Sequence, residues 1–136
     1  MTSDANCQLW AARAQALLRI VAGYVFLLHG CSKLFHVPHV AYFDNLQLFS
    51  LMGLAGVIEV VAGILLILGL FTRIAAFIAS GEMAFAYFMG HVGGGGHALL
   101  PILNGGEAAV LYCFIFLFLA AAGGGAWSLD AARRKA

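Results

Sequence analysis

Four long apolar stretches, separated by short segments that carry most of the polar residues, form the pattern of this chain. Each stretch approaches the roughly 20 residues that a transmembrane helix needs, and none alternates apolar and polar residues as a membrane β-strand does. Because backbone groups inside lipid must be hydrogen-bonded internally, helices are the expected structure. We predict membrane-spanning helices at residues 14–33, 49–70, 74–93 and 106–123.

The first apolar stretch shares some features with a secretory signal peptide, since Arg13 and Arg19 precede the apolar run Ile20–Leu28. The run ends in the polar segment His29–Lys33, which lacks a small-residue cleavage motif. We therefore expect an uncleaved first span. The fold class that follows is all-α, with residues 1–136 forming one integral membrane four-helix bundle and no second domain.

The composition agrees with a membrane location. Hydrophobic residues make up 63% of the chain and charged residues 10%, whereas soluble domains carry about 25% charged residues. These values disfavour a soluble enzyme core, a disordered chain and a nucleic-acid binder. The lipid bilayer is the expected partner, and no nucleic acid is expected.

The basic residues are unevenly distributed over the expected spans, and they predict the orientation. Four spans place both termini and the short loop at residues 71–73 on the same side of the membrane. The opposite side carries only Lys33. Because basic residues concentrate on the cytoplasmic side of membrane proteins, we expect both termini to be cytoplasmic, together with Arg13, Arg19, Arg73, Arg133, Arg134 and Lys135.

The two outer loops have different compositions. The first, Leu34–Leu48, is aromatic, and we expect it to lie along the membrane surface. The second contains Gly93–Gly96, and we expect it to be mobile or packed over the mouth of the bundle. It lacks the Lys-Ser/Thr ending of a phosphate-binding loop. Small residues in the second and third spans predict close helix contacts or a homo-oligomer interface.

Three ionisable residues lie well inside the expected spans: Arg19, Glu59 and Glu82. Charged groups cost about 2.5–3.5 kcal/mol at the centre of a spanning helix, so they are functional candidates that face inward and pair. We predict a buried polar network, in which Arg19, Lys33 or Tyr87 is the partner of the two glutamates. A purely structural role that fixes which helices meet is an equal alternative for Arg19 and Glu59, and Glu82 as a protonated, hydrogen-bonded acid is another.

A second group of polar residues lies toward the outer ends of the spans. His29 and Lys33 share one face of the first span, and Tyr87 and His91 share one face of the third. With Glu107, they form our candidate ligand-binding set at the outer mouth of the bundle. No metal site is expected, because no spacing among the five histidines matches a known ligand pattern, and we interpret the others as loop residues: His36, His39 and His97.

The three cysteines fall at different expected depths: Cys7 in the cytoplasm, Cys31 near the outer face and Cys113 inside the fourth span. Without a Cys-x-x-Cys motif, thiol–disulfide exchange is disfavoured. Cys31 alone has an expected position that suits a reactive thiol, and the favoured interpretation is a small apolar filler.

The order of these motifs resembles the DoxX family of small bacterial membrane proteins. The resemblance is carried by Arg19, Leu27–Phe35, Gly56–Glu59, Gly63–Arg73, Glu82–Tyr87, His91, Pro101, Asn104–Glu107 and Trp127–Asp130. It implies a four-helix bundle of the bacterial inner membrane. The family name derives from a subunit of a thiosulfate:quinone oxidoreductase, which implies redox protein subunits as partners.

Two functions from different classes follow. The first is a membrane subunit of a quinone-linked oxidoreductase, which has no intrinsic cofactor, binds a quinone and receives electrons from a partner because no haem, flavin or iron–sulfur motif is present. The second is a non-enzymatic structural or assembly subunit, or a small carrier, whose polar residues lock the helices together. A transporter is disfavoured because inverted repeats and broken helices are not evident.

Overall fold

The computed structural model describes residues 2–93, 95 and 97–134 of the chain. This part of the chain is all-helical and contains no strand. Its long helices are α1 (Thr2–Phe35), α2 (Leu51–Leu68), α3 (Thr72–Ala86), which continues into the π-helix η2 (Tyr87–Val92), and α5 (Glu107–Ala122). The shorter helices lie in the connections: η1 (Ala41–Phe43), α4 (Pro101–Asn104) and α6 (Leu129–Arg133).

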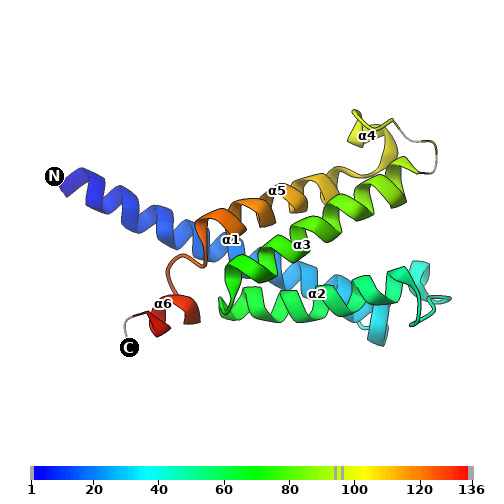
Figure 1. The fold of residues 1–136 in the computed structure, drawn as a ribbon, viewed down its shortest axis with the longest axis horizontal. Coiled ribbons are helices and arrows are strands. Elements are labelled where there is room, and N and C mark those ends of the chain that lie inside the picture. Colours follow the sequence, from blue (N-terminus) through cyan, green and yellow to red (C-terminus); the bar gives the residue numbers. More distant parts are fainter. Residues whose placement is uncertain (1, 94, 96, 135–136) are drawn as a thin grey trace.

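The long helices pack mainly as two pairs, α1 with α2 and α3 with α5, and α2 is joined to α3 by a tight turn (Figure 1). Glycines allow the backbones of α1 and α2 to approach closely. A Cβ atom at Gly30 would lie 2.7 Å from the backbone nitrogen of Val60, and one at Gly63 would lie 2.8 Å from the Cβ of Leu27. Close contact at small residues is the usual way in which helices associate in lipid.

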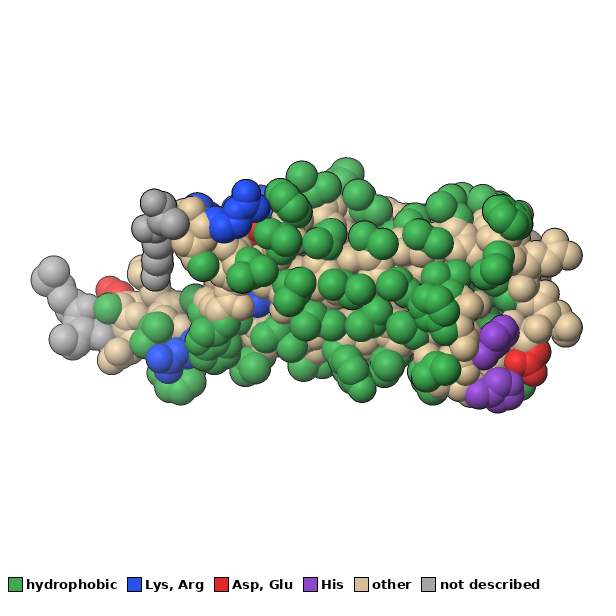
Figure 2. All heavy atoms as spheres, turned by 90° about the horizontal axis from the view of Figure 1, so that it is seen from below, with side chains coloured by type: hydrophobic (Ala, Val, Ile, Leu, Met, Phe, Trp, Pro, Cys, Tyr) green, Lys and Arg blue, Asp and Glu red, His purple; other side chains and the backbone are tan. Residues whose placement is uncertain are grey.

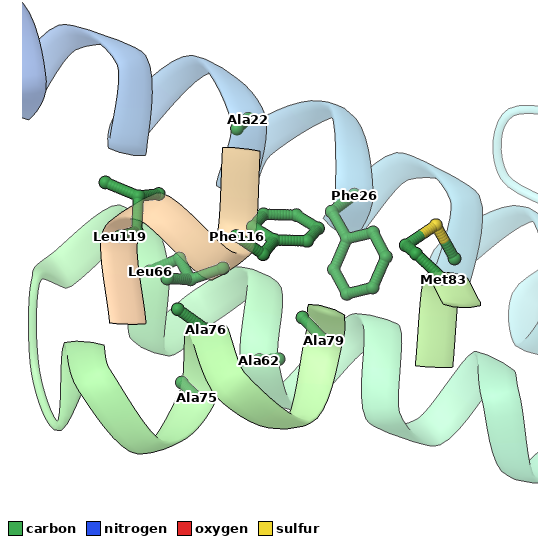
Figure 3. Close-up of a cluster of buried hydrophobic side chains, with 10 residues drawn as sticks. All are labelled: Ala22, Phe26, Ala62, Leu66, Ala75, Ala76, Ala79, Met83, Phe116 and Leu119. Carbon is green, nitrogen blue, oxygen red and sulfur yellow. The ribbon is translucent and has the colours of Figure 1, made fainter. Parts of the chain in front are cut away.

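A core cluster joins the two pairs. The aromatic rings of Phe26 on α1 and Phe116 on α5 meet edge to face, with 4.8 Å between their centroids. Leu66 of α2 and the small residues Ala76 and Ala79 of α3 fill the remaining space (Figure 3). Since all four long helices contribute, this cluster fixes the positions of the polar residues that they carry.

Large apolar side chains cover the outside of the molecule as well. Figure 2 shows a visible face covered by hydrophobic side chains, with its Lys and Arg side chains toward one end, its His side chains at the other, and acidic side chains at both. By length and hydropathy, α1 and α2 can each cross a membrane, with mean hydropathies of 1.4 and 2.5. α5 is apolar but shorter. This surface indicates a membrane protein.

The helices differ in detail from the spans expected from sequence. α1 begins at Thr2 rather than near residue 14, because its polar first turns contain no Pro or Gly to interrupt them. α3 begins at Thr72, two residues before the expected span. α4 and α6 were not predicted. Gly94, Gly96 and Lys135, to which the sequence assigned a loop and a cytoplasmic charge, lie outside the described residues.

Candidate functional site

A buried ion pair joins the outer part of α1 to α2. The Nζ of Lys33 lies 2.7 Å from Oε1 of Glu59, and the two side chains are only 10% and 3% exposed. The packing of α1 against α2 positions the pair, since a Cβ at Gly56 would lie 3.1 Å from the Cβ of Lys33. The ammonium also lies 5.7 Å from the ring centroid of Phe43 in η1, which is within the range of a cation–π interaction.

Glu82 of α3 adds a second carboxylate to this pair. Its side chain stem is partly exposed, but both carboxylate oxygens are buried, and it interacts electrostatically with Glu59 and Lys33. Neither oxygen of Glu82, nor Oε2 of Glu59, has a hydrogen-bond partner among the described residues. We call Lys33, Glu59 and Glu82 the acid cluster. It presents three buried acceptor atoms without donors, an arrangement that costs free energy unless a proton or a ligand occupies it.

Tyr87 and His91 form a separate polar group with the second outer loop. The hydroxyl of Tyr87 donates to the carbonyl of Ala98 at 2.8 Å and accepts from Nδ2 of Asn104 at 3.2 Å. Nδ1 of His91 lies 3.0 Å from the carbonyl oxygen of Asn104. Tyr87 and His91 belong to the π-helical segment η2, a rare conformation that often occurs at functional sites. These bonds tie the loop to the end of α3.

The expected outer ligand set is therefore divided rather than convergent. Lys33 pairs with Glu59 instead of joining Tyr87 and His91. His29 is exposed on α1, and Glu107 is exposed at the first residue of α5. The sequence predicted the position of these residues along their helices. It could not predict how each helix is rotated about its own axis, and this rotation leaves His29 and Glu107 exposed.

Arg19 is separated from both glutamates, contrary to the single network that the sequence predicted. It lies 14 residues before Lys33 on α1, or about 21 Å along the helix axis. Its side chain is fully buried, and within the described residues the guanidinium donates only to backbone carbonyls, in the last turn of α2 and in the segment before α6. The acceptors are Leu66, Ile67 at 2.8 Å, Gly124 at 2.8 Å and Trp127 at 2.9 Å.

Asp130 is a functional position that the sequence analysis did not single out. Its carboxylate accepts from the backbone N–H groups of Phe71 and Thr72, both at 2.9 Å, at the beginning of α3. Burial opposes ionisation of this carboxyl, but the bonds from Thr72 and Phe71 and the charge of Arg134 outweigh it, so that the pKa of Asp130 is lowered. The signal in the sequence was the pair Ser128 and Asp130, a helix-capping serine followed two residues later by an acid in the first turn of α6.

Metal and thiol chemistry find little support in this arrangement. The described residues contain no group of three His, Cys, Asp or Glu side chains close enough to hold a metal ion. Cys7, Cys31 and Cys113 are free thiols, and Cys31 is half-buried on α1. The chemistry available to the acid cluster is the binding and release of protons and the donation of hydrogen bonds from Lys33 and from a protonated carboxyl.

Comparison with known proteins gives the family. A family model described as DoxX matches residues 14–92. The chain belongs to the DoxX family. The match includes the entire acid cluster and Arg19 but ends before Asn104 and Asp130. The chain is also 53% identical over 116 residues to an uncharacterized protein of Haemophilus influenzae, which covers 85% of this chain and 87% of that protein. No solved structure matches.

Proposed function

We propose that this chain crosses the bacterial inner membrane four times, as a four-helix bundle with both termini in the cytoplasm. Basic residues gather at one end: Arg19 and Arg73 contact the segment around the end of α5, and Arg133 lies over the ring of Phe71. The acid cluster lies toward the other end. The positive-inside rule then assigns the arginine-rich end to the cytoplasm.

Within that topology, the protein is a membrane subunit of a redox system that binds a quinone at the acid cluster. The observation that carries this proposal is the three buried carboxylate oxygens without donors beside a single lysine. The pair of Lys33 and Glu59 is neutral overall. A charged Glu82 would add an uncompensated charge inside the membrane at a cost of about 2.5–3.5 kcal/mol. The uncharged acid is the lower-energy form, so Glu82 holds a proton.

The surface of α3 next to Glu82 is exposed. A Cβ built on the neighbouring Gly81 would meet no atom within 4 Å. The stem of Glu82 is partly exposed at this surface, and its carboxyl oxygens are buried behind it. A lipophilic carrier can therefore approach α3 sideways from the bilayer, which suits a quinone and does not suit a water-soluble substrate.

The chemistry divides between this chain and a partner. Reduction of a quinone to a quinol consumes electrons and protons in equal number. The protonated Glu82 donates a hydrogen bond and then the first of two protons to a quinone oxygen, and Lys33 stabilises the negative charge that develops. Water supplies the second proton and reprotonates Glu82. The electrons come from a redox subunit bound to this one, because the acid cluster itself carries no electron donor.

Quinone binding is tested with the whole protein in lipid nanodiscs by calorimetric titration with a short-tailed ubiquinone. Glu82→Leu removes the donor and is expected to weaken binding about tenfold, the effect of one lost hydrogen bond to a buried group. In the wild type, affinity falls as pH rises because a carboxylate cannot donate, whereas Glu82→Gln is independent of pH. Glu107→Gln, an exposed carboxyl at the outer end of α5, serves as the matched control and behaves like the wild type.

Absence of quinone binding by the wild type, or equal affinities for the wild type and Glu82→Leu, overturns the proposal. A non-enzymatic structural or assembly subunit is the second candidate, and the carbonyl contacts of Arg19 favour it. In that case, substitutions at Arg19 and Glu59 lower the abundance of the protein in membranes, and no quinone-dependent property changes separately from abundance.

A further inference from the structure

A cavity of about 480 Å³ opens at the arginine-rich end, between the α2–α3 turn, the end of α5 and α6. Its volume falls within the range of small-ligand sites. Three arginines line it, Arg73, Arg133 and Arg134, together with one acid, Asp130. The cavity therefore carries an excess of positive charge. It is distinct from the acid cluster, which joins the last turn of α1 to the middle of α2 and to α3.

The single acid does not neutralise the arginines. Both oxygens of Asp130 accept from backbone N–H groups at the start of α3, and none of the three arginines lies within salt-bridge distance of it in the described part of the chain. Only Arg134 interacts with it at longer range. The guanidinium groups are thus available to an anion, and their planar donors fit the oxygens of a phosphate.

Two of the arginines are already held in place. Nη1 of Arg73 donates to the carbonyls of Ala120 and Ala121, at 3.2 and 2.5 Å. Its remaining nitrogens lie beside Gly123, where a Cβ atom would come within 3.5 Å of Nε and Nη2. The guanidinium of Arg133 lies 5.4 Å from the ring centroid of Phe71. Because the site is largely preorganised, little conformational entropy is lost when an anion binds.

A buried hydroxyl and two apolar side chains complete the lining. Thr72 is 0% exposed, and its hydroxyl lies near the carboxylate of Asp130, where it helps to lower the pKa of that acid. Phe71 and Ile74, which also line the cavity, are 50% and 64% exposed. A free anion would contact the arginines but not these apolar side chains. A ligand with a charged headgroup and hydrocarbon chains would contact both.

We propose that this cavity binds the phosphate headgroup of an acidic phospholipid, with its acyl chains against Phe71 and Ile74. The inference rests on the proposed orientation, which places this end at the cytoplasmic leaflet. Anionic lipids give that leaflet its negative surface potential, and basic pockets between membrane helices bind their headgroups. The lipid bridges α3 and α6 and so attaches the C-terminal segment to the membrane surface.

The test measures lipid preference of the full chain by native mass spectrometry in detergent, with phosphatidylglycerol and phosphatidylcholine in competition. The wild type is expected to retain phosphatidylglycerol at least about tenfold over phosphatidylcholine, and Arg133→Gln combined with Arg134→Gln removes most of that preference. Both arginines are exposed, so the variant keeps its fold. Arg13→Gln is the matched control, because Arg13 lies over Trp10 on α1 and does not line the cavity.

Equal retention of both lipids by the wild type, or an equal loss in Arg13→Gln, overturns the proposal. If inorganic phosphate displaces phosphatidylglycerol at a concentration similar to that of the lipid, the ligand is a free anion, and this result also overturns the proposal. Orientation is checked separately by labelling the exposed Cys7 in intact cells with a membrane-impermeant maleimide. Labelling from outside refutes the topology, whereas a missing lipid preference with Cys7 protected refutes only the lipid site.

Discussion

Two groups of buried charge in this molecule, Arg19 and the acid cluster, differ in how completely they are hydrogen-bonded. At the arginine-rich end, the buried guanidinium of Arg19 donates to four carbonyl groups, so its hydrogen-bonding capacity is well used. In the acid cluster, one lysine meets two carboxyl groups, and three of their oxygens have no donor among the residues that the structure describes. A buried charge whose hydrogen bonds are all made stabilises the fold. A buried charge that lacks hydrogen-bond partners destabilises it, and binding of a ligand or a proton there relieves that cost.

The strongest test of this contrast is the removal of Arg19. Arg19→Ala removes the guanidinium donor from four carbonyls, in two buried and two part-buried hydrogen bonds, and we expect the free energy of unfolding to fall by about 3 kcal/mol or more. Thermal unfolding in detergent, followed by circular dichroism, measures the change. Arg13→Ala on the same helix, where the arginine is only partly buried and lies over the ring of Trp10, should shift the midpoint little. An unchanged midpoint for Arg19→Ala would remove the structural role assigned to this residue.

Breaking the ion pair in the acid cluster has the next largest expected effect. Glu59→Gln leaves the ammonium of Lys33 buried beside a neutral amide, which should cost about 2–4 kcal/mol. The double variant Lys33→Met with Glu59→Gln should be less destabilised than the sum of the single changes, because no unpaired charge remains. Unfolding measurements on all four proteins complete the double-mutant cycle. Additive effects would mean that the two residues do not interact.

A change in the opposite direction is expected at Glu82. Glu82→Leu removes two buried acceptors that have no donor and adds apolar surface, so stability should stay constant or rise by about 1 kcal/mol. The same variant is expected to bind quinone weakly, which separates loss of function from loss of fold. Destabilisation as large as that of Glu59→Gln would show that Glu82 has a structural partner.

The smallest effect concerns pH and Asp130. The pKa of this carboxyl is lower in the folded protein than the usual value of about 3.9. Its contribution to stability is therefore complete above that value and is lost as pH falls through the folded pKa. Asp130→Asn should lower stability by about 1 kcal/mol near neutral pH, a typical helix-capping effect, and by less below about pH 3. Unfolding midpoints across this range, compared with the wild type, provide the check.

Sequence reasoning anticipated the helices better than their polar contacts. Hydropathy placed the long helices, because apolar length is a property of the sequence alone. The partner of Glu59 remained one of three alternatives, since two helices of unknown rotation bring different faces together. The contacts of Arg19 were out of reach for another reason: its acceptors are backbone carbonyls, which every residue possesses and no side-chain pattern marks.

Local backbone features also escaped prediction. The π-helix at Tyr87–Val92 keeps the spacing of an apolar helix, so nothing in the pattern distinguishes it from α-helix. The cap that Asp130 provides to α3 depends on a return of the chain from nearly sixty residues away. Such long-range contacts become visible only once the C-terminal segment is seen beside the α2–α3 turn.

The uninterrupted length of α1 has a geometric consequence. With 34 residues and about 1.5 Å of rise per residue, the helix is about 50 Å long, well beyond the roughly 30 Å of the hydrocarbon layer. In the proposed topology, this excess length requires that the helix tilts or that its first turns, with Trp10 exposed, extend beyond the hydrocarbon layer. Because α1 continues without a break from Thr2 to Phe35, its first turns and Lys33 belong to one continuous helix.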